Sequence, residues 1–122
     1  MTLYQIRATT TLADNTTKNI DFTVPEGKIW IVHYVRMNNG DDVSRNCQVQ
    51  ILDSSGALLH VAQSRTIGAG SSSDMLFYET DAYTGRPLLI KGGNKLRLQW
   101  AAGGASSGGS SYYCITYEEI PE

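Results

Sequence analysis

The residues most able to carry out chemistry in this sequence are its two histidines, His33 and His60. His33 lies inside an apolar run, and His60 follows a short polar segment. Neither has a third metal ligand at a telling spacing, and the His-x-His pattern of many metal sites is absent. Isolated histidines in strands pack or form hydrogen bonds far more often than they bind metals. We therefore assign the histidines no functional role.

Acidic and hydroxyl side chains are the next candidates. Asp41, Asp42 and Asp53 are possible oxygen ligands for calcium, but they lack the regular acidic spacing of a calcium loop, and such aspartates usually close turns. Serine is abundant without a Gly-x-Ser-x-Gly motif, and phosphate-binding glycine patterns are absent. Glu118 and Glu119 are adjacent, so on a strand they point to opposite faces. The sequence predicts no enzyme and no cofactor; a metal-dependent enzyme of cupin type is a distant alternative.

The two cysteines, Cys47 and Cys114, are too few for a disulfide scaffold or for a zinc site made of cysteines alone. Residues 1–7 do not have the pattern of a signal peptide, so we expect both to be free, buried thiols that point inward. A bridge between them is the alternative.

Composition and charge exclude further classes. The chain has 122 residues, with ten basic and twelve acidic side chains and a net charge of −2, which does not favour binding to nucleic acid. No apolar run reaches about 18 residues, so no membrane partner is expected. The length predicts one domain over residues 1–122.

The elements that must position any site are strands, because the apolar residues repeat every second position. Short polar turns separate these alternating segments, for example at residues 53–56 and 91–94. We predict an all-β fold, an antiparallel β-sandwich resembling a jelly roll, with eight or nine strands. A helix over residues 57–65 is the alternative for that segment. The expected strands are 3–9, 18–24, 28–38, 45–53, 57–63, 73–79, 87–91 (opened by Pro87), 95–101 and 111–119.

The expected strand 28–38 is apolar on both faces, with Trp30, Val32 and Tyr34 on one side and Ile29, Ile31 and Val35 on the other. This pattern is typical of a central strand or of one covered by a neighbouring subunit. The chain is also rich in tyrosine for its size, Tyr78 and Tyr83 included, and tyrosine is enriched at interfaces. We expect a homo-oligomer, with a trimer favoured. A row of exposed aromatics that binds sugar rings is the alternative. The interface candidates are Trp30, Tyr34, Tyr112, Tyr113 and Tyr117.

Two segments of low complexity, 68–73 and 101–111, are dominated by glycine, alanine and serine. Such composition predicts flexible surface loops, or loops that become ordered against a partner. The end segments 1–9 and 117–122 are candidates for arms that reach a neighbouring molecule, and the acidic residues of 118–122 suit a basic partner surface.

One phrase of the sequence, residues 24–35 (VPEGKIWIVHYV), resembles the Val-Pro-x-Gly-Lys-x-Trp entry strand of small all-β virion proteins of tailed bacteriophages. Segments 49–56 and 88–98, the serine and glycine loop and the tyrosine-bearing last strand are similar in order, so the likeness covers about residues 18–119. The resemblance implies a jelly-roll domain that assembles as an oligomer on the virion surface. It is most like capsid decoration (cement) proteins, which would make the major capsid protein a partner and the host cytoplasm the place of assembly. Tail, collar or fibre accessory proteins are the alternative. The family has no catalytic residues to transfer.

Overall fold

The computed structural model describes residues 2–77 and 88–122, so Tyr78, Tyr83, Pro87 and the end of the expected strand 73–79 lie outside the described residues. The described residues contain strands and no helix, and thus no helix that could cross a membrane. The expected all-β fold is confirmed. Residues 58–65 of the segment 57–65 lie in a strand, so the helical alternative is wrong there. The strands are β1 (Leu3–Leu12), β2 (Lys18–Thr23), β3 (Lys28–Asn38), β4 (Arg45–Leu52), β5 (Leu58–Ile67), β6 (Ser72–Leu76), β7 (Leu88–Lys91), β8 (Lys95–Trp100) and β9 (Gly109–Pro121).

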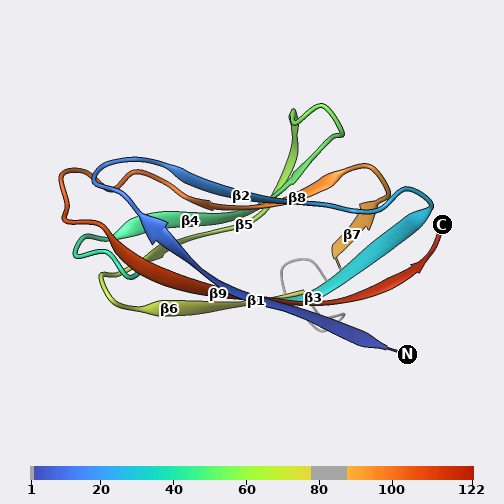
Figure 1. Cartoon of the computed structure of the whole chain (residues 1–122), viewed down its shortest axis with the longest axis horizontal. Helices are drawn as coiled ribbons and strands as arrows, with labels where there is room; N and C mark the ends of the chain where they lie inside the picture. Colours follow the sequence, from blue (N-terminus) through green and yellow to red (C-terminus); the bar gives the residue numbers. More distant parts are fainter. Residues whose placement is uncertain (1, 78–87) are drawn as a thin grey trace.

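The strands form two antiparallel sheets that pack face to face (Figure 1). The first sheet has the order β1-β9-β3-β6, with β7 also pairing with β3, and the second has the order β2-β8-β4-β5. Strand pairs nest around the β4–β5 hairpin, which is the innermost pair: β3 with β6 and β7, β2 with β8, and β1 with β9. The pairs β3–β9 and β4–β8 join these nested pairs into the two sheets. This wrapping of one long hairpin into two sheets is the jelly-roll arrangement.

The core lies between the sheets and is built from the inward side chains of alternating strands. Trp100, Leu98 and Leu96 of β8 are fully buried there, as the period of two predicts. Trp100 also donates a hydrogen bond from Nε1 to the carbonyl oxygen of Asn38, at 2.9 Å. A large aromatic side chain buries its polar atom at low cost when that atom has such a partner.

A bulge at His33 changes the facing of the second half of β3. The register with β9 shifts between Val32 and Tyr34, and an extra residue in one strand reverses the alternation beyond it. Val32 and Val35 therefore both point into the core, while Tyr34 points outward. The expected grouping of Trp30, Val32 and Tyr34 on one face is wrong for Tyr34, because the pattern of alternation alone cannot show a bulge.

A buried ion pair holds the loops together at one end of the sandwich. The Arg45 side chain is fully buried, and all five of its N–H groups donate hydrogen bonds. Two reach Oδ2 of Asp41, at 2.9 and 2.7 Å from Nε and Nη2, and the others reach the carbonyl oxygens of Ala13, Thr16 and Ala101. Three separate connections of the chain are thus tied to one guanidinium group.

Hydrogen bonds to side chains at the same end of the molecule fix the serine- and glycine-rich segment 101–108. Its backbone amides donate to the side chains of Thr17, Asn15, Asp14, Asp42 and Asp41 at 2.7–3.1 Å. This loop was expected to be flexible or to become ordered on a partner. Its own chain supplies the acceptors that hold it.

Candidate functional site

The five interface candidates divide into buried and accessible residues. Trp30 and Tyr113 keep only 5% and 7% of their surface exposed and belong to the core. Tyr34 and Tyr117 are half-buried, and Tyr112 is 42% exposed. Tyr112 and Tyr113 are neighbours on β9, so they point to opposite faces, as the sequence predicts. Of the five candidates, only Tyr34, Tyr112 and Tyr117 are thus accessible enough to contact a partner directly.

Tyr34 and Tyr112 lie on the outer face of the first sheet, where a hydrogen-bonded network holds them. Asp74 Oδ1 accepts from the Tyr34 hydroxyl and from Arg36 Nη1, each at 2.7 Å. Arg36 Nη2 lies 3.5 Å from the Tyr112 hydroxyl, and the guanidinium carbon is 5.9 Å from the centre of the Tyr112 ring. The Tyr112 hydroxyl also lies 2.8 Å from Oγ of Ser72. The Arg36 head group is therefore held in one orientation.

The network shifts the pKa values of its members in the directions that its contacts require. The hydrogen bond from Tyr34, followed by that from Arg36, lowers the pKa of the Asp74 carboxyl. Burial and the hydrogen bond to Asp74 raise the pKa of Tyr34. The contacts with Ser72 and Arg36 lower the pKa of Tyr112.

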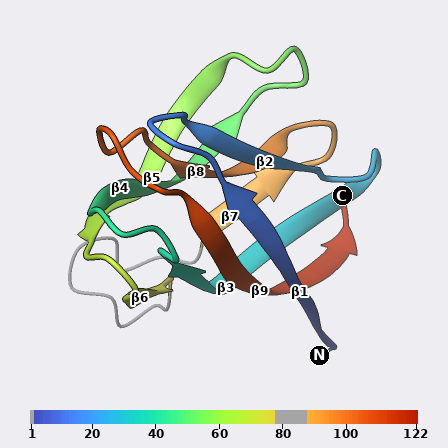
Figure 2. The ribbon, with the colours of Figure 1, turned by 60° about the vertical axis from the view of Figure 1, so that its left-hand side comes forward.

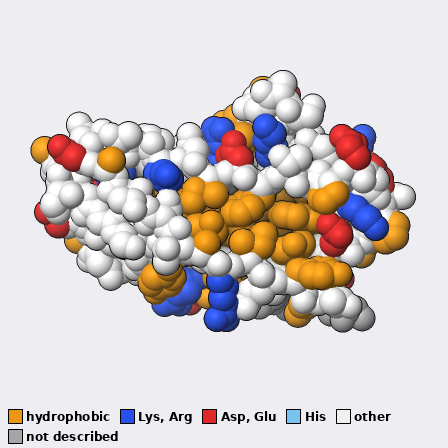
Figure 3. Space-filling model, in the orientation of Figure 1, with side chains coloured by type: hydrophobic (Ala, Val, Ile, Leu, Met, Phe, Trp, Pro, Cys, Tyr) orange, Lys and Arg blue, Asp and Glu red, His pale blue; other side chains and the backbone are white. Residues whose placement is uncertain are grey.

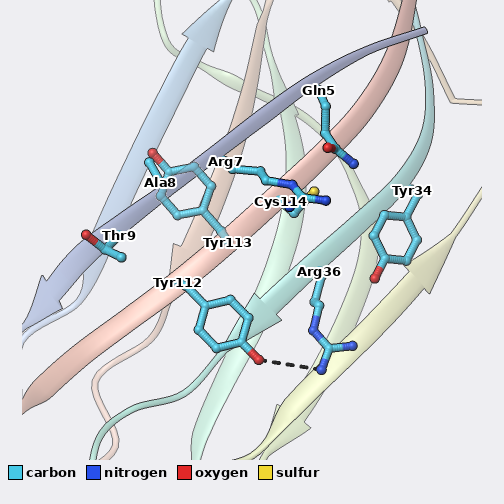
Figure 4. Close-up of a pocket in the computed structure, with 9 residues that line it drawn as sticks. All are labelled: Gln5, Arg7, Ala8, Thr9, Tyr34, Arg36, Tyr112, Tyr113 and Cys114. Carbon is cyan, nitrogen blue, oxygen red and sulfur yellow. Dashed lines mark hydrogen bonds between the residues drawn. The ribbon is translucent and has the colours of Figure 1, made fainter.

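Beside this network the outer face has an open depression of about 480 Å³ (Figure 4). Its centre is a row of three residues in register on adjacent strands: Arg7 on β1, Cys114 on β9 and Arg36 on β3. Figure 4 shows the Arg7 side chain reaching across β9 over Cys114. Tyr34 on β3 and Tyr112 on β9 also line the depression.

The position of Cys114 in this depression corrects an expectation. Cys47 points into the core, and burial raises the pKa of its thiol to about 12. Cys114 lies between the inward residues Tyr113 and Ile115 and thus points outward; it is 9% exposed and lies outside the core cluster. Both thiols are free and buried, as expected. A bridge between an inner and an outer face of the sandwich is ruled out by geometry.

A second candidate region lies on the open side of the sandwich, where the edge strands β1 and β2 face solvent. Tyr117 stacks between Trp30 and Tyr4, with ring centres 4.1 and 5.6 Å apart. Figure 3 shows an apolar strip between β2 and the parts of β1 and β3 that lie below it. We call this the edge strip. Its hydrophobic residues on the edge strands and β9 are Tyr4, Ile6, Ile20, Phe22 and Tyr117.

The histidines and acidic residues do not form a metal site. His33 Nε2 lies 2.6 Å from Oε1 of Glu118, and His60 lies on β5 in the other sheet. Asp41 pairs with Arg45, whereas Asp53 closes the turn at the opposite end of β4 through Ser55 and Ala57. Within residues 2–77 and 88–122, no group of three or more His, Cys, Asp and Glu side chains could hold a metal ion.

The end segments proposed as arms are paired within the chain itself. Residues 3–12 pair with β9 along their whole length, and β9 continues to Pro121, opposite Lys28. Glu119 accepts a hydrogen bond from Trp30 Nε1 at 3.1 Å, so the two neighbouring glutamates do serve opposite faces. These segments are therefore strands of the first sheet and not extended arms, although the outer edge of β1 has no strand partner in the described part of the chain.

Comparison with known proteins places the fold but not a family. No protein-family model and no curated protein matches the chain. Among solved structures it is similar to one described as the crystal structure of PirA, with a TM-score of 0.55 and 14% identity over 92% of this chain and 93% of that one. The capsid asymmetric unit of cyanophage Pam1 (TM-score 0.46, 20% identity, 94% and 80% of the chains) and the tobacco streak virus coat protein (0.46, 11%, 96% and 87%) are also similar. At these identities the likeness shows the fold alone.

Proposed function

We propose that this chain is a structural protein of a tailed-bacteriophage virion, a capsid decoration protein that stabilises the head by bridging neighbouring capsid subunits. The edge strip is the observation that carries the proposal. Soluble monomers rarely leave a contiguous apolar surface uncovered, and such a surface usually marks a contact between proteins. The resemblance of residues 24–35 to a motif of phage virion proteins supports the further proposal that the partner proteins are those of a phage particle. The protein acts on the capsid surface and assembles in the cytoplasm of the host.

The edge strip is proposed to bind a second copy of this chain. It lies between the free edges of β1 and β2, whose outer backbone groups have no strand neighbour in the described part of the chain. Tyr4 is 45% exposed, and Ile6, Ile20 and Phe22 are half-buried. A copy that covers these side chains and pairs with one edge gains both apolar burial and backbone hydrogen bonds. A closed ring of such contacts forms a trimer, the state that the resemblance implies.

The remaining surface suits weak contacts with a shell. The β4–β5 hairpin projects from the sandwich (Figure 2), and it presents Leu58 and Leu59, 55% and 57% exposed. The clamped loop 101–108 forms a preformed platform at the other end of β4. An oligomer that engages several capsid subunits through such sites gains avidity, even when each contact is weak. Preferential binding to the assembled shell then raises the stability of the shell by mass action.

The oligomer is tested first, by light scattering coupled to size-exclusion chromatography. The wild-type chain is expected to elute with the mass of three copies. Tyr4→Ser removes an exposed ring from the edge strip and should shift the mass toward the monomer. Leu59→Ser removes a comparably exposed apolar group from the hairpin and should leave the mass unchanged. A wild-type monomer at micromolar concentration, or equal effects of the two substitutions, contradicts the interface.

The decoration function is tested on particles. Virions that lack this chain are heated beside complete ones, and the temperature at which packaged DNA is released is compared. The complete particles should release DNA at the higher temperature, and adding the purified chain back should restore the difference. Identical release temperatures reject the decoration function. Presence of the chain only in tails, collars or fibres favours the alternative virion role.

A further inference from the structure

The depression on the outer face of the first sheet has a distribution of charge that the proposed function does not use. Arg7 and Arg36 sit on either side of the strand that carries Cys114, and both align with that residue. Adjacent strands lie about 4.8 Å apart, so the two arginine backbones are separated by roughly 10 Å. The Arg7 side chain reaches across β9, whereas the Arg36 guanidinium is held toward Asp74 on β6. Both arginines line the depression, which leaves room for a small anionic group between the two head groups.

The two arginines differ in what already binds them. Arg36 shares its charge with Asp74 and is held in place by two tyrosines. Arg7 is exposed, and within residues 2–77 and 88–122 no carboxylate lies within ion-pair distance of it. Arg36 is thus preoriented by its partners, whereas the charge of Arg7 is not paired with a carboxylate among the described residues. Guanidinium groups bind carboxylates through paired, charge-assisted hydrogen bonds.

The neutral parts of the depression suit a ring that carries hydroxyl groups. Figure 4 shows the Tyr34 and Tyr112 rings broadside, with their hydroxyls tied down at the sheet surface. An aromatic face of this kind packs against the apolar face of another ring. Gln5 and Thr9 on β1 line the same depression and offer an amide and a hydroxyl group. These are donors and acceptors that match sugar hydroxyls.

We propose that this depression binds a carboxylated saccharide, with the sugar carboxylate between Arg7 and Arg36 and the ring against Tyr34 and Tyr112. A single-stranded nucleic acid is disfavoured, because its successive phosphates need a longer basic groove and this chain has a net charge of −2. An acidic segment of a protein needs no ring platform. The site is independent of the edge strip, since Ile6 and Arg7 point to opposite faces of β1.

The experiment is a titration of the full-length, ¹⁵N-labelled chain followed by amide chemical shifts in NMR spectra. D-Glucuronate is the probe, and D-glucose at the same millimolar concentration and ionic strength is the matched neutral sugar. Glucuronate should shift the amides around Arg7, Cys114 and Arg36, and glucose should bind much more weakly. Absence of shifts with glucuronate, or equal shifts with both sugars, overturns the proposal. An acetylated Glu-Glu dipeptide is the third probe. If it binds at the depression with an affinity equal to that of glucuronate, the proposal is also overturned, and the depression is assigned to an acidic protein partner.

Variants separate the site from a general charge effect. Arg7→Gln should weaken glucuronate binding by roughly tenfold or more, since it removes one charge-assisted pair. Arg65→Gln removes an exposed arginine from β5 in the other sheet and should leave the affinity unchanged. Equal losses in both variants overturn the assignment. Light scattering on the same samples shows whether the oligomeric mass is preserved, so a failure of this site is distinguishable from a failure of the proposed assembly.

Discussion

Substituting Arg45 with methionine is expected to remove a large part of the folding stability of this protein. The change deletes all five hydrogen bonds of the guanidinium group, and a methionine of similar length fills most of its space. The Asp41 carboxylate then stays buried without its cation. The carbonyl oxygens of Ala13, Thr16 and Ala101 also lose the hydrogen bond from Arg45.

The magnitude follows from the burial of the pair. Removing one partner of a buried ion pair costs about 3–5 kcal/mol, because the other charge is left without compensation. The side chains of Arg45 and Asp41 both have no exposed surface, so solvent cannot replace the lost contact. For a chain of this size the loss corresponds to a drop in Tm of roughly 12–20 °C. Arg97→Met is the matched control: its pair with Asp21 is partly exposed, and such pairs are worth about 0–1 kcal/mol.

The assay is urea denaturation at two pH values. Burial by itself raises the pKa of Asp41, but the hydrogen bonds from Arg45 and from Asp42 outweigh it and hold that pKa well below its usual range. In Arg45→Met the hydrogen bonds from Arg45 are lost, while burial and the backbone hydrogen bonds from Asp42 and Gly108 remain. The folded variant therefore takes up a proton at Asp41 more readily than the folded wild-type chain does. The difference in free energy of unfolding between the wild-type chain and Arg45→Met should therefore be largest at pH 7 and shrink toward pH 3.

The double variant Arg45→Met with Asp41→Asn, which lacks the buried charge, should be more stable at pH 7 than Arg45→Met alone. A loss no larger than that of Arg97→Met, or a deficit that does not change with pH, refutes the reasoning.

Three further outcomes are expected. Gly40→Ala should lower the free energy of unfolding by about 1–3 kcal/mol in thermal denaturation, because its Cβ would overlap the carbonyl oxygen of Ser110. Gly68→Ala should lower it far less, because its Cβ would meet nothing nearer than 3.7 Å. Equal losses in the two variants contradict this expectation. In native thiol labelling at pH 8, Cys114 under the Arg7 side chain should react before Cys47, whose thiol is buried in the core; the reverse order contradicts the assigned facing. The stability of the wild-type chain should decrease as the pH falls below about 4, because folding lowers the pKa of several carboxyls and the unfolded state then binds more protons; a stability that rises over this range in denaturation curves contradicts the sign. The carboxyls concerned belong to Asp21, Asp41, Asp53 and Asp74.

The strands of this protein could be predicted from its sequence because their signal is local. Alternation of apolar and polar residues, with turn residues such as those at 53–56 and 91–94 between the alternating segments, needs no knowledge of partners. Residues 57–65 were ambiguous for the same reason: a short apolar segment fits two periods. Pairing with β4 makes this segment a strand. That pairing is a contact between two segments, and the periodicity within one segment carries no information about it.

The facing of individual side chains depended on the tertiary structure. The bulge at His33 arises from the fit of β3 against β9, and it turns Tyr34 outward and Val35 inward. Alternation along its strand does not fix the facing of Cys114, because an alternating pattern allows two phases, one with the thiol inward and one with it outward. The burial of Tyr113 and Ile115 selects the one that puts the thiol outside.

The two candidate sites illustrate the division between local and long-range information. The tyrosines of the last strand and the apolar segment around Trp30 stand out in the sequence by residue type, so they could be nominated as contact residues. Nothing local connects Arg7, Arg36 and Cys114, which are far apart in the chain. Their alignment requires the register of three strands, and register is set by hydrogen bonds between distant segments. The sequence by itself thus determined which segments become strands, whereas only the packing of those strands decided which charged and aromatic side chains share one face.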